Sequence, residues 1–200
     1  MPHFKSSLPR FTAALAIAAA LFSAPWTVSP AFAADYRIDL AHSFVQFRTQ
    51  HLGFSWLVGQ FNRFNGSFEY DSSNADGPRN IRVELDTASI DSNHAERDKH
   101  LRSDDFLDTD TYPRALFTST GYSGDADGGE LRGDLELHGV TRPIVITMRK
   151  IGEGPDPWGG YRAGFEGSTV ITRGNFGIDR DLGPMAEKVE LSLYIEGIRQ

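Results

Sequence analysis

The 200-residue chain contains no cysteine, which excludes disulfide bonds, thiol nucleophiles and metal sites built from thiolates. Long apolar runs are also scarce. The longest, residues 11–22, has 12 residues, whereas a membrane-spanning helix needs about 20. Phosphate-binding loops and the dinucleotide-binding fingerprint are missing as well. The sequence must therefore bury an uncross-linked core, and it offers no standard nucleotide site.

The first 33 residues have the three parts of a secretory signal peptide. Lys5 and Arg10 form a basic start, residues 11–22 are apolar, and Ala31-Phe32-Ala33 is a small-x-small cleavage pattern. We therefore expect cleavage before Ala34, export to the periplasm and one mature domain over residues 34–200. A membrane anchor is the alternative, but the apolar run is too short for one.

Basic residues are outnumbered by acidic ones. Lys and Arg total 20 against 27 Asp and Glu, and removing the leader changes the net charge from −7 to 18 − 27 = −9. An acidic surface argues against nucleic acids and anionic membranes as partners. We expect neither nucleic-acid binding nor stable membrane insertion.

Most of the mature chain alternates apolar and polar residues, as half-buried strands do. Short turns separate the segments, which suits an antiparallel meander closing into a barrel. The prediction is an all-β domain of eight strands. Their approximate ranges are 35–51, 58–71, 81–90, 115–123, 130–138, 144–151, 161–172 and 189–198.

Residues 89–106 interrupt the alternation and carry the one convincing helical pattern of the mature chain. Ser92 or Asn93 could cap this helix, with Glu96 at a capping-box spacing. Such an insertion between two strands can close a barrel end or place polar groups at a mouth.

Phenylalanines recur on the faces predicted to point inward, beside glycines such as Gly66 and Gly167. Two interpretations stay open. Large rings next to glycines can leave an apolar cavity, or they can fill a tight core. An eight-stranded barrel accommodates either arrangement.

Candidate metal and catalytic groups are sparse. His94 and His100 are six residues apart, which is not a helical ligand pair, so we predict no metal site. Ser89, His94 and Asp98 include the residue types of a hydrolase triad, but no nucleophile elbow is present. We expect a capping network around Arg97, Asp98 and His100 rather than catalytic residues.

An ordered set of short motifs resembles the YceI-like family of exported, lipocalin-like polyisoprenoid-binding proteins. The set covers essentially the whole mature chain. Its pieces are Tyr36-x-x-Asp39-x-x-His42-Ser43-x-Val45-x-Phe47, His51-Leu52-Gly53, Gly59-x-Phe61-x-x-Phe64-x-Gly66, Ser89-Ile90-x-x-Asn93-x-x-x-Arg97-Asp98-x-His100-Leu101, Tyr112-Pro113, Gly133-x-Leu135-x-Leu137-x-Gly139-Val140-Thr141 and Arg173-x-x-Phe176-Gly177.

The resemblance implies an extended eight-stranded antiparallel barrel whose apolar lumen holds a long isoprenoid, a quinone-like molecule or another long-chain lipid, with no required cofactor. We expect His51, Arg97 and Asp98 at the mouth or near a lipid head group. A lumen isomerase or hydrolase, a stress-related periplasmic interaction protein, a homodimer and a membrane redox or lipid-handling partner stay open. The expected lumen residues are Val45, Phe47, Phe61, Phe64, Phe68, Leu85, Phe117, Leu135, Phe165 and Phe176.

Overall fold

The computed structural model describes Met1, residues 33–71, residue 73 and residues 76–200. The expected signal peptide therefore lies almost entirely outside the described residues. The strands are β1 (Ala34–Ile38), β2 (Phe44–His51), β3 (Ser55–Phe61), β4 (Phe64–Tyr70), β5 (Arg79–Asp86), β6 (Ile90–Asp91), β7 (Arg114–Gly124), β8 (Gly128–Leu137), β9 (Val140–Pro155), β10 (Tyr161–Thr172) and β11 (Lys188–Arg199).

The helical elements are short. The α-helix is α1 (Ala95–Arg102), and the 3₁₀ turns are η1 (Thr87–Ser89), η2 (Arg173–Phe176) and η3 (Pro184–Ala186). Within the described residues, no helix is long and apolar enough to cross a membrane.

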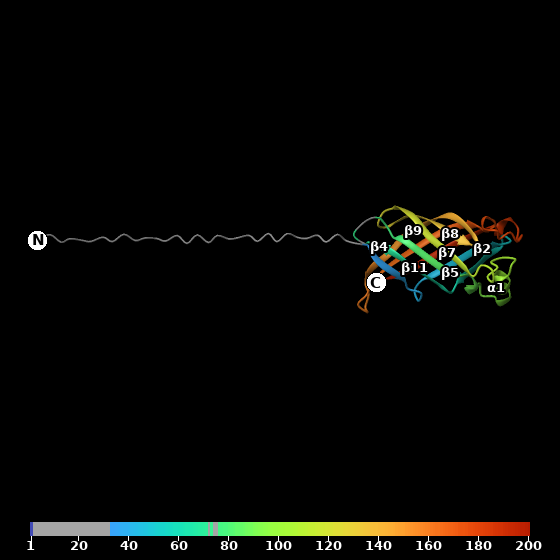
Figure 1. Ribbon diagram of the computed structural model, residues 1–200, viewed down its shortest axis with the longest axis horizontal. Helices are drawn as coiled ribbons and strands as arrows, with labels where there is room; N and C mark the ends of the chain where they lie inside the picture. Colours follow the sequence, from blue (N-terminus) through green and yellow to red (C-terminus); the bar gives the residue numbers. More distant parts are fainter. Residues whose placement is uncertain (2–32, 72, 74–75) are drawn as a thin grey trace. The chain divides into compact units, whose positions relative to one another are not determined.

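The strands close into an antiparallel barrel (Figure 1). β1 pairs with both β4 and β11, which joins the two ends of the meander. Two strands of the wall are long and interrupted: β1 and β2 form one, and β3 and β4 form the other. The pairing of β11 with both β1 and β2 shows this for the first. Counted in this way, eight strands form the wall, and the eight-stranded prediction is confirmed.

Alternation along the strands separates the two faces of the wall. In β2, Val45 and Phe47 are buried while Arg48 is exposed and pairs with Glu190 on the outer face. The period-two pattern therefore turns one side of each strand toward the interior and the other toward water.

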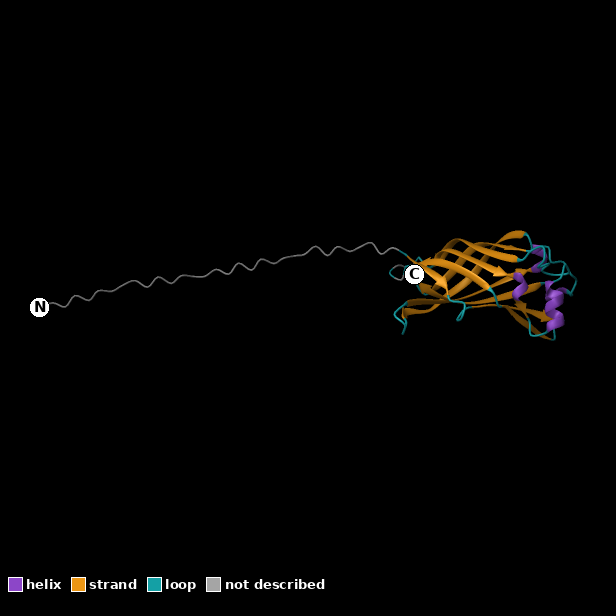
Figure 2. Ribbon diagram, turned by 60° about the horizontal axis from the view of Figure 1, so that its bottom comes forward, coloured by secondary structure: helices purple, strands orange, loops and turns teal. Residues whose placement is uncertain are grey.

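One end of the wall is incomplete. β3 pairs with β2 along its length, but its other edge pairs with β6 only at Gln60 and Phe61. Residues 87–113, which include α1, lie at this end of the barrel (Figure 2). The helical insertion thus occupies the place where the strands separate.

The helix begins later than its sequence suggests. His94, not Ser92 or Asn93, is the N-cap, and its Nδ1 accepts a hydrogen bond from the Arg97 N–H at 3.2 Å. Asn93 has a φ of 61°, outside the helical range, and its N–H bonds Asp91. Ser92 instead donates to Asp98, so the expected cap is used to anchor the helix.

Candidate functional site

An apolar cavity of about 480 Å³ runs inside the barrel. This volume lies within the range of roughly 300–1,000 Å³ that small-molecule sites have. Side chains from opposite sides of the wall line it, including Val45 and Phe47 from β2, Phe117 from β7 and Leu193 from β11. On β11 the lining runs from Val189 to Ile195, a span of about 20 Å along an extended strand.

The mouth of the cavity lies at the α1 end. Among all residues that line the cavity, only His51, His100 and Leu182 are exposed. His51 ends β2, His100 lies on α1, and Leu182 lies in the connection from β10 to β11. A ligand from solvent would therefore enter between these three elements.

Aromatic rings close the opposite end. Phe68 stacks on Tyr36 with centroids 5.1 Å apart, and Phe165 meets the edges of Phe68 and Tyr70 at 5.7 and 5.3 Å. Phe68 and Phe165 line the cavity, whereas Tyr36 and Tyr70 are buried behind them. Burial raises the pKa of Tyr70 above its usual value.

Several rings pack closely against glycines of neighbouring strands. A Cβ at Gly59 would come within 2.4 Å of Phe47, and one at Gly133 within 2.4 Å of Phe117. Because each glycine leaves room on the wall, these rings lie along the wall of the lumen. The Phe-beside-Gly pattern is thus compatible with an open interior.

Charged groups at the mouth are held by their own neighbours. Arg97 lines the cavity and donates from Nε to Ser92 Oγ at 2.7 Å and from Nη2 to the Ser92 carbonyl. His100 Nε2 bonds Asp105 at 2.7 Å, and Asp105 in turn accepts from Arg180 at 3.0 Å. These bonds link α1 to the β10–β11 connection across the mouth.

Arg173 shapes the other side of the mouth. Its guanidinium donates to the carbonyls of Ala186, Ile178 and Arg180 at 2.8, 2.9 and 2.6 Å, and it lines the cavity. One side chain thereby fixes the loop that carries Leu182.

Residues 36–197 match the YceI-like domain family. The chain belongs to the YceI-like family. It is 51% identical over 195 residues to a UPF0312 protein of Pseudomonas aeruginosa, covering 96% of this chain and all of the relative. The fold also resembles that of BcnA from Burkholderia cenocepacia, with a TM-score of 0.71 and 21% identity, over 80% of this chain and 98% of that one.

A second solved structure, a polyisoprenoid binding domain from Saccharophagus degradans implicated in plant cell wall breakdown, shares the fold. Its TM-score is 0.60 at 14% identity, over 84% of this chain and 99% of that domain. At these identities the solved structures bear on the YceI-like fold alone.

The structure brings most of the expected lumen residues of this YceI-like chain together. Phe64 is buried in the core but does not line the cavity. Phe176 is the last residue of the η2 turn, which ends the alternation of β10, and it lies with the outward-facing Val145 and Val170. Those that line the cavity are Val45, Phe47, Phe61, Phe68, Leu85, Phe117, Leu135 and Phe165.

Two of the three expected mouth residues line the cavity, and the third does not. His51 and Arg97 line the cavity at its mouth. Asp98 does not, because its carboxylate is buried and accepts two hydrogen bonds from Ser92. Burial alone would raise the pKa of Asp98, but these bonds and the charges of Arg102 and Arg97 lower it. Asp98 anchors α1.

The residue types of a hydrolase triad do not assemble into one. Ser89 Oγ donates to the Asp86 carbonyl at 2.6 Å, His94 caps α1, and Asp98 bonds Ser92. Each group therefore has a separate structural partner.

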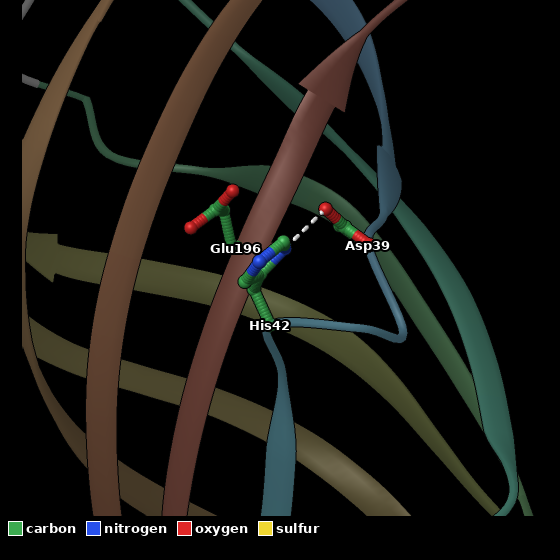
Figure 3. A group of neighbouring side chains, drawn as sticks. All are labelled: Asp39, His42 and Glu196. Carbon is green, nitrogen blue, oxygen red and sulfur yellow. Dashed lines mark hydrogen bonds and ion pairs between the residues drawn. The ribbon is translucent and has the colours of Figure 1, made fainter. Parts of the chain in front are cut away.

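Asp39, His42 and Glu196 offer three potential metal ligands on the wall (Figure 3). However, Arg162 donates to both carboxylates, and its Nε reaches Asp156 at 2.9 Å. Hydrogen bonds from His42 and Arg162 lower the pKa of Asp39 to about 2. A guanidinium thus supplies the positive charge that a cation would bring, and the cluster fits an ion-pair network.

Sequence reasoning missed Arg173, Leu182 and Ala186 as parts of the mouth. They lie in the irregular stretch between β10 and β11, where no periodicity assigns a side chain to a face. The motif Arg173-x-x-Phe176-Gly177 was the one signal present, and it marked the position without giving its role.

Proposed function

We propose that this protein binds a long-chain isoprenoid or a similar lipid inside the barrel and carries it in the periplasm. One observation supports this most strongly: the cavity is lined by apolar side chains along its depth, while His51, Arg97 and His100 stand at its mouth. That distribution fits an amphiphile whose chain lies inside and whose polar end remains at the opening. The polyisoprenoid-binding domain with the same fold is an independent reason to choose an isoprenoid chain.

The energetics favour such a ligand. Removing a chain from water gives roughly 0.8 kcal/mol per buried CH₂ group. Forty carbons would therefore give about 30 kcal/mol if all were buried, more than a cavity lined over about 20 Å of β11 encloses. The practical ceiling of non-covalent affinity is roughly 20 kcal/mol. Ordering of the chain and incomplete burial must therefore offset much of the gross value. Enough remains for a lipid to stay bound through purification.

The leader pattern of residues 1–33 supports export, and we propose that the carrier works outside the cytoplasm. A carrier is useful there because the aqueous space between two membranes excludes free long-chain lipids. Catalysis on a lipid inside the lumen is the competing function, and polar groups of the lining such as Arg97 and His100 would be its candidate residues.

The test is to express the full chain with its leader, purify the mature protein without detergent and analyse bound molecules by native mass spectrometry and lipid extraction. We expect an intact long-chain lipid at close to one molecule per protein, and a mature N-terminus at Ala34. Recovery of a chemically altered lipid would favour the enzyme. A protein that is empty and remains empty after incubation with isoprenoid lipids would contradict the proposal.

A further inference from the structure

We propose that four exposed apolar side chains at the mouth form a docking surface for a lipid bilayer, from which the ligand enters the cavity. We call this set the apolar rim; its members are Leu52, Phe54, Leu182 and Met185. The inference rests on the proposed lipid-carrying function and specifies where the lipid is exchanged.

The rim comes from two loops that lie side by side. Leu52 and Phe54 form the β2–β3 turn and are 59% and 86% exposed. A Cβ at Gly53 would be 4.0 Å from Met185 Cγ in the η3 loop, which brings the two loops together. Exposed apolar side chains that gather at one place mark interaction sites more often than scattered ones do.

The rim is continuous with the cavity. Leu182 is exposed and also lines the cavity, while His51 and Ala186 line it immediately beside Leu52 and Met185. A lipid chain leaving the acyl region of a bilayer could therefore pass over Leu182 into the lumen while remaining in contact with apolar groups. A bilayer is therefore the expected partner, because the cavity and the rim both present apolar side chains to lipid chains.

Charges near the rim indicate how docking works. Residues 180–188 contain Arg180 and Lys188 against Asp181 and Glu187, so they carry no net charge. The mature chain is acidic overall, which opposes attraction to anionic lipids. The rim must therefore bind by shallow apolar insertion, as interfacial segments do, and not by electrostatic attraction.

Two exposed apolar side chains away from the mouth provide a matched control. Leu40, in the turn before β2, is 56% exposed, and Trp158, in the β9–β10 loop, is 78% exposed. They match Leu52 and Phe54 in exposure and apolar character, yet neither lines the cavity. Phe44 and His51, at the two ends of β2, are about 23 Å apart along the strand, which separates Leu40 from Leu52.

The experiment is flotation of the mature protein with phosphatidylcholine vesicles, and with vesicles that also contain phosphatidylglycerol, at low and high salt. Three proteins are compared: wild type, Leu52→Ser/Phe54→Ser, and the control Leu40→Ser/Trp158→Ser. We expect wild type and control to float with both vesicles, with less than about a twofold effect of salt. The rim variant should partition at least about tenfold more weakly.

Equal flotation of the rim variant and wild type would overturn the proposal. So would the absence of wild-type binding to either vesicle, or binding that needs phosphatidylglycerol and disappears in salt. Cavity occupancy is measured separately by native mass spectrometry. A lipid-loaded protein that ignores vesicles refutes docking alone, whereas a protein that docks but never takes up lipid refutes the carrier function alone.

Discussion

Asp39 shows how single residues stabilise the wall far from the mouth. Its carboxylate is 13% exposed and joins β1 to β10 through Arg162, while His42 bonds it from the following turn. These partners favour the ionised form in the folded state, which is the reason for the depressed pKa of about 2. The linked stability is complete above the unfolded pKa near 3.8 and is lost as the pH falls toward 2.

We therefore predict that Asp39→Asn lowers the free energy of unfolding by about 1 to 2 kcal/mol at pH 7. The difference between variant and wild type should shrink between pH 4 and pH 2, where wild-type Asp39 itself becomes protonated. Urea titrations across this pH range measure it. A difference that stays constant down to pH 2 would show that the ion-pair network is not the cause.

Individual rings at the closed end set the depth of the cavity. Phe165 is 7% exposed, lines the cavity and separates it from Tyr70. Replacing Phe165 with leucine removes part of this wall and deepens the lumen, so we predict a shift of the bound lipids toward longer chains.

The comparison is between Phe165→Leu and Phe176→Leu, each incubated with a mixture of isoprenoids of different length. Phe176 is 2% exposed and equally part of a packed region, but it does not line the cavity. Native mass spectrometry reports the chain-length distribution. The same distribution in both variants and in wild type would mean that the aromatic closure does not determine ligand length.

At the scale of elements, α1 is held at the barrel end by few contacts. The buried Asp98 carboxylate accepts from the Ser92 N–H at 2.8 Å and from the Ser92 hydroxyl, and Arg102 donates to the carbonyls of Ala88 and Ile90. The helix has little apolar surface of its own: Leu101 is its one large apolar side chain packed against the core, and Asp98 is its buried residue. Polar anchoring thus adds to the packing of Leu101.

Asp98→Ala should consequently destabilise this element by about 3 kcal/mol, because buried donors of Ser92 lose a charged acceptor. We expect faster hydrogen exchange in residues 92–113 with little change in β7 to β11, and faster lipid release. Asp104→Ala, an exposed acidic neighbour, serves as the control. Loss of protection spread evenly over the barrel would contradict the local role given to Asp98.

Particular elements show why some features could be predicted from the sequence. In strands such as residues 161–172, apolar and polar residues alternate along the whole strand. The period of two therefore predicts which face of the sheet each side chain takes. The β10–β11 connection has no such period, so the positions of Leu182 and Met185 depended on packing against the β2–β3 turn. Phe176 was misplaced for the same reason, because it ends the η2 turn, where the regular period of β10 no longer assigns side chains to a face.

The described part of the molecule combines a closed wall of strands with one end that is built from α1 and loops. Eight long strands close on themselves, and the interior remains open because rings such as Phe47 lie over glycines such as Gly59. Among the residues that line the cavity, charged and histidine side chains gather mainly where the strands separate. A lipid carrier requires this asymmetry, since the chain must be enclosed while the polar end stays accessible.

The central claim is that the lumen itself holds the lipid chain, and neighbouring residues of β10 test it directly. Gly167 lines the cavity, and a Cβ there would meet Ile146 Cγ2 at 2.9 Å, so the Ile146 side chain must shift slightly. Ser168 is exposed on the outer face of the same strand. Gly167→Phe therefore places a ring in the lumen, and Ser168→Phe places the same ring outside.

The measurement is bound lipid per folded protein, by native mass spectrometry after both variants pass a circular dichroism check for wild-type β-structure. The account predicts that Gly167→Phe loses most of its lipid, while Ser168→Phe keeps wild-type occupancy. Full occupancy in folded Gly167→Phe would contradict the claim that the chain lies inside the barrel.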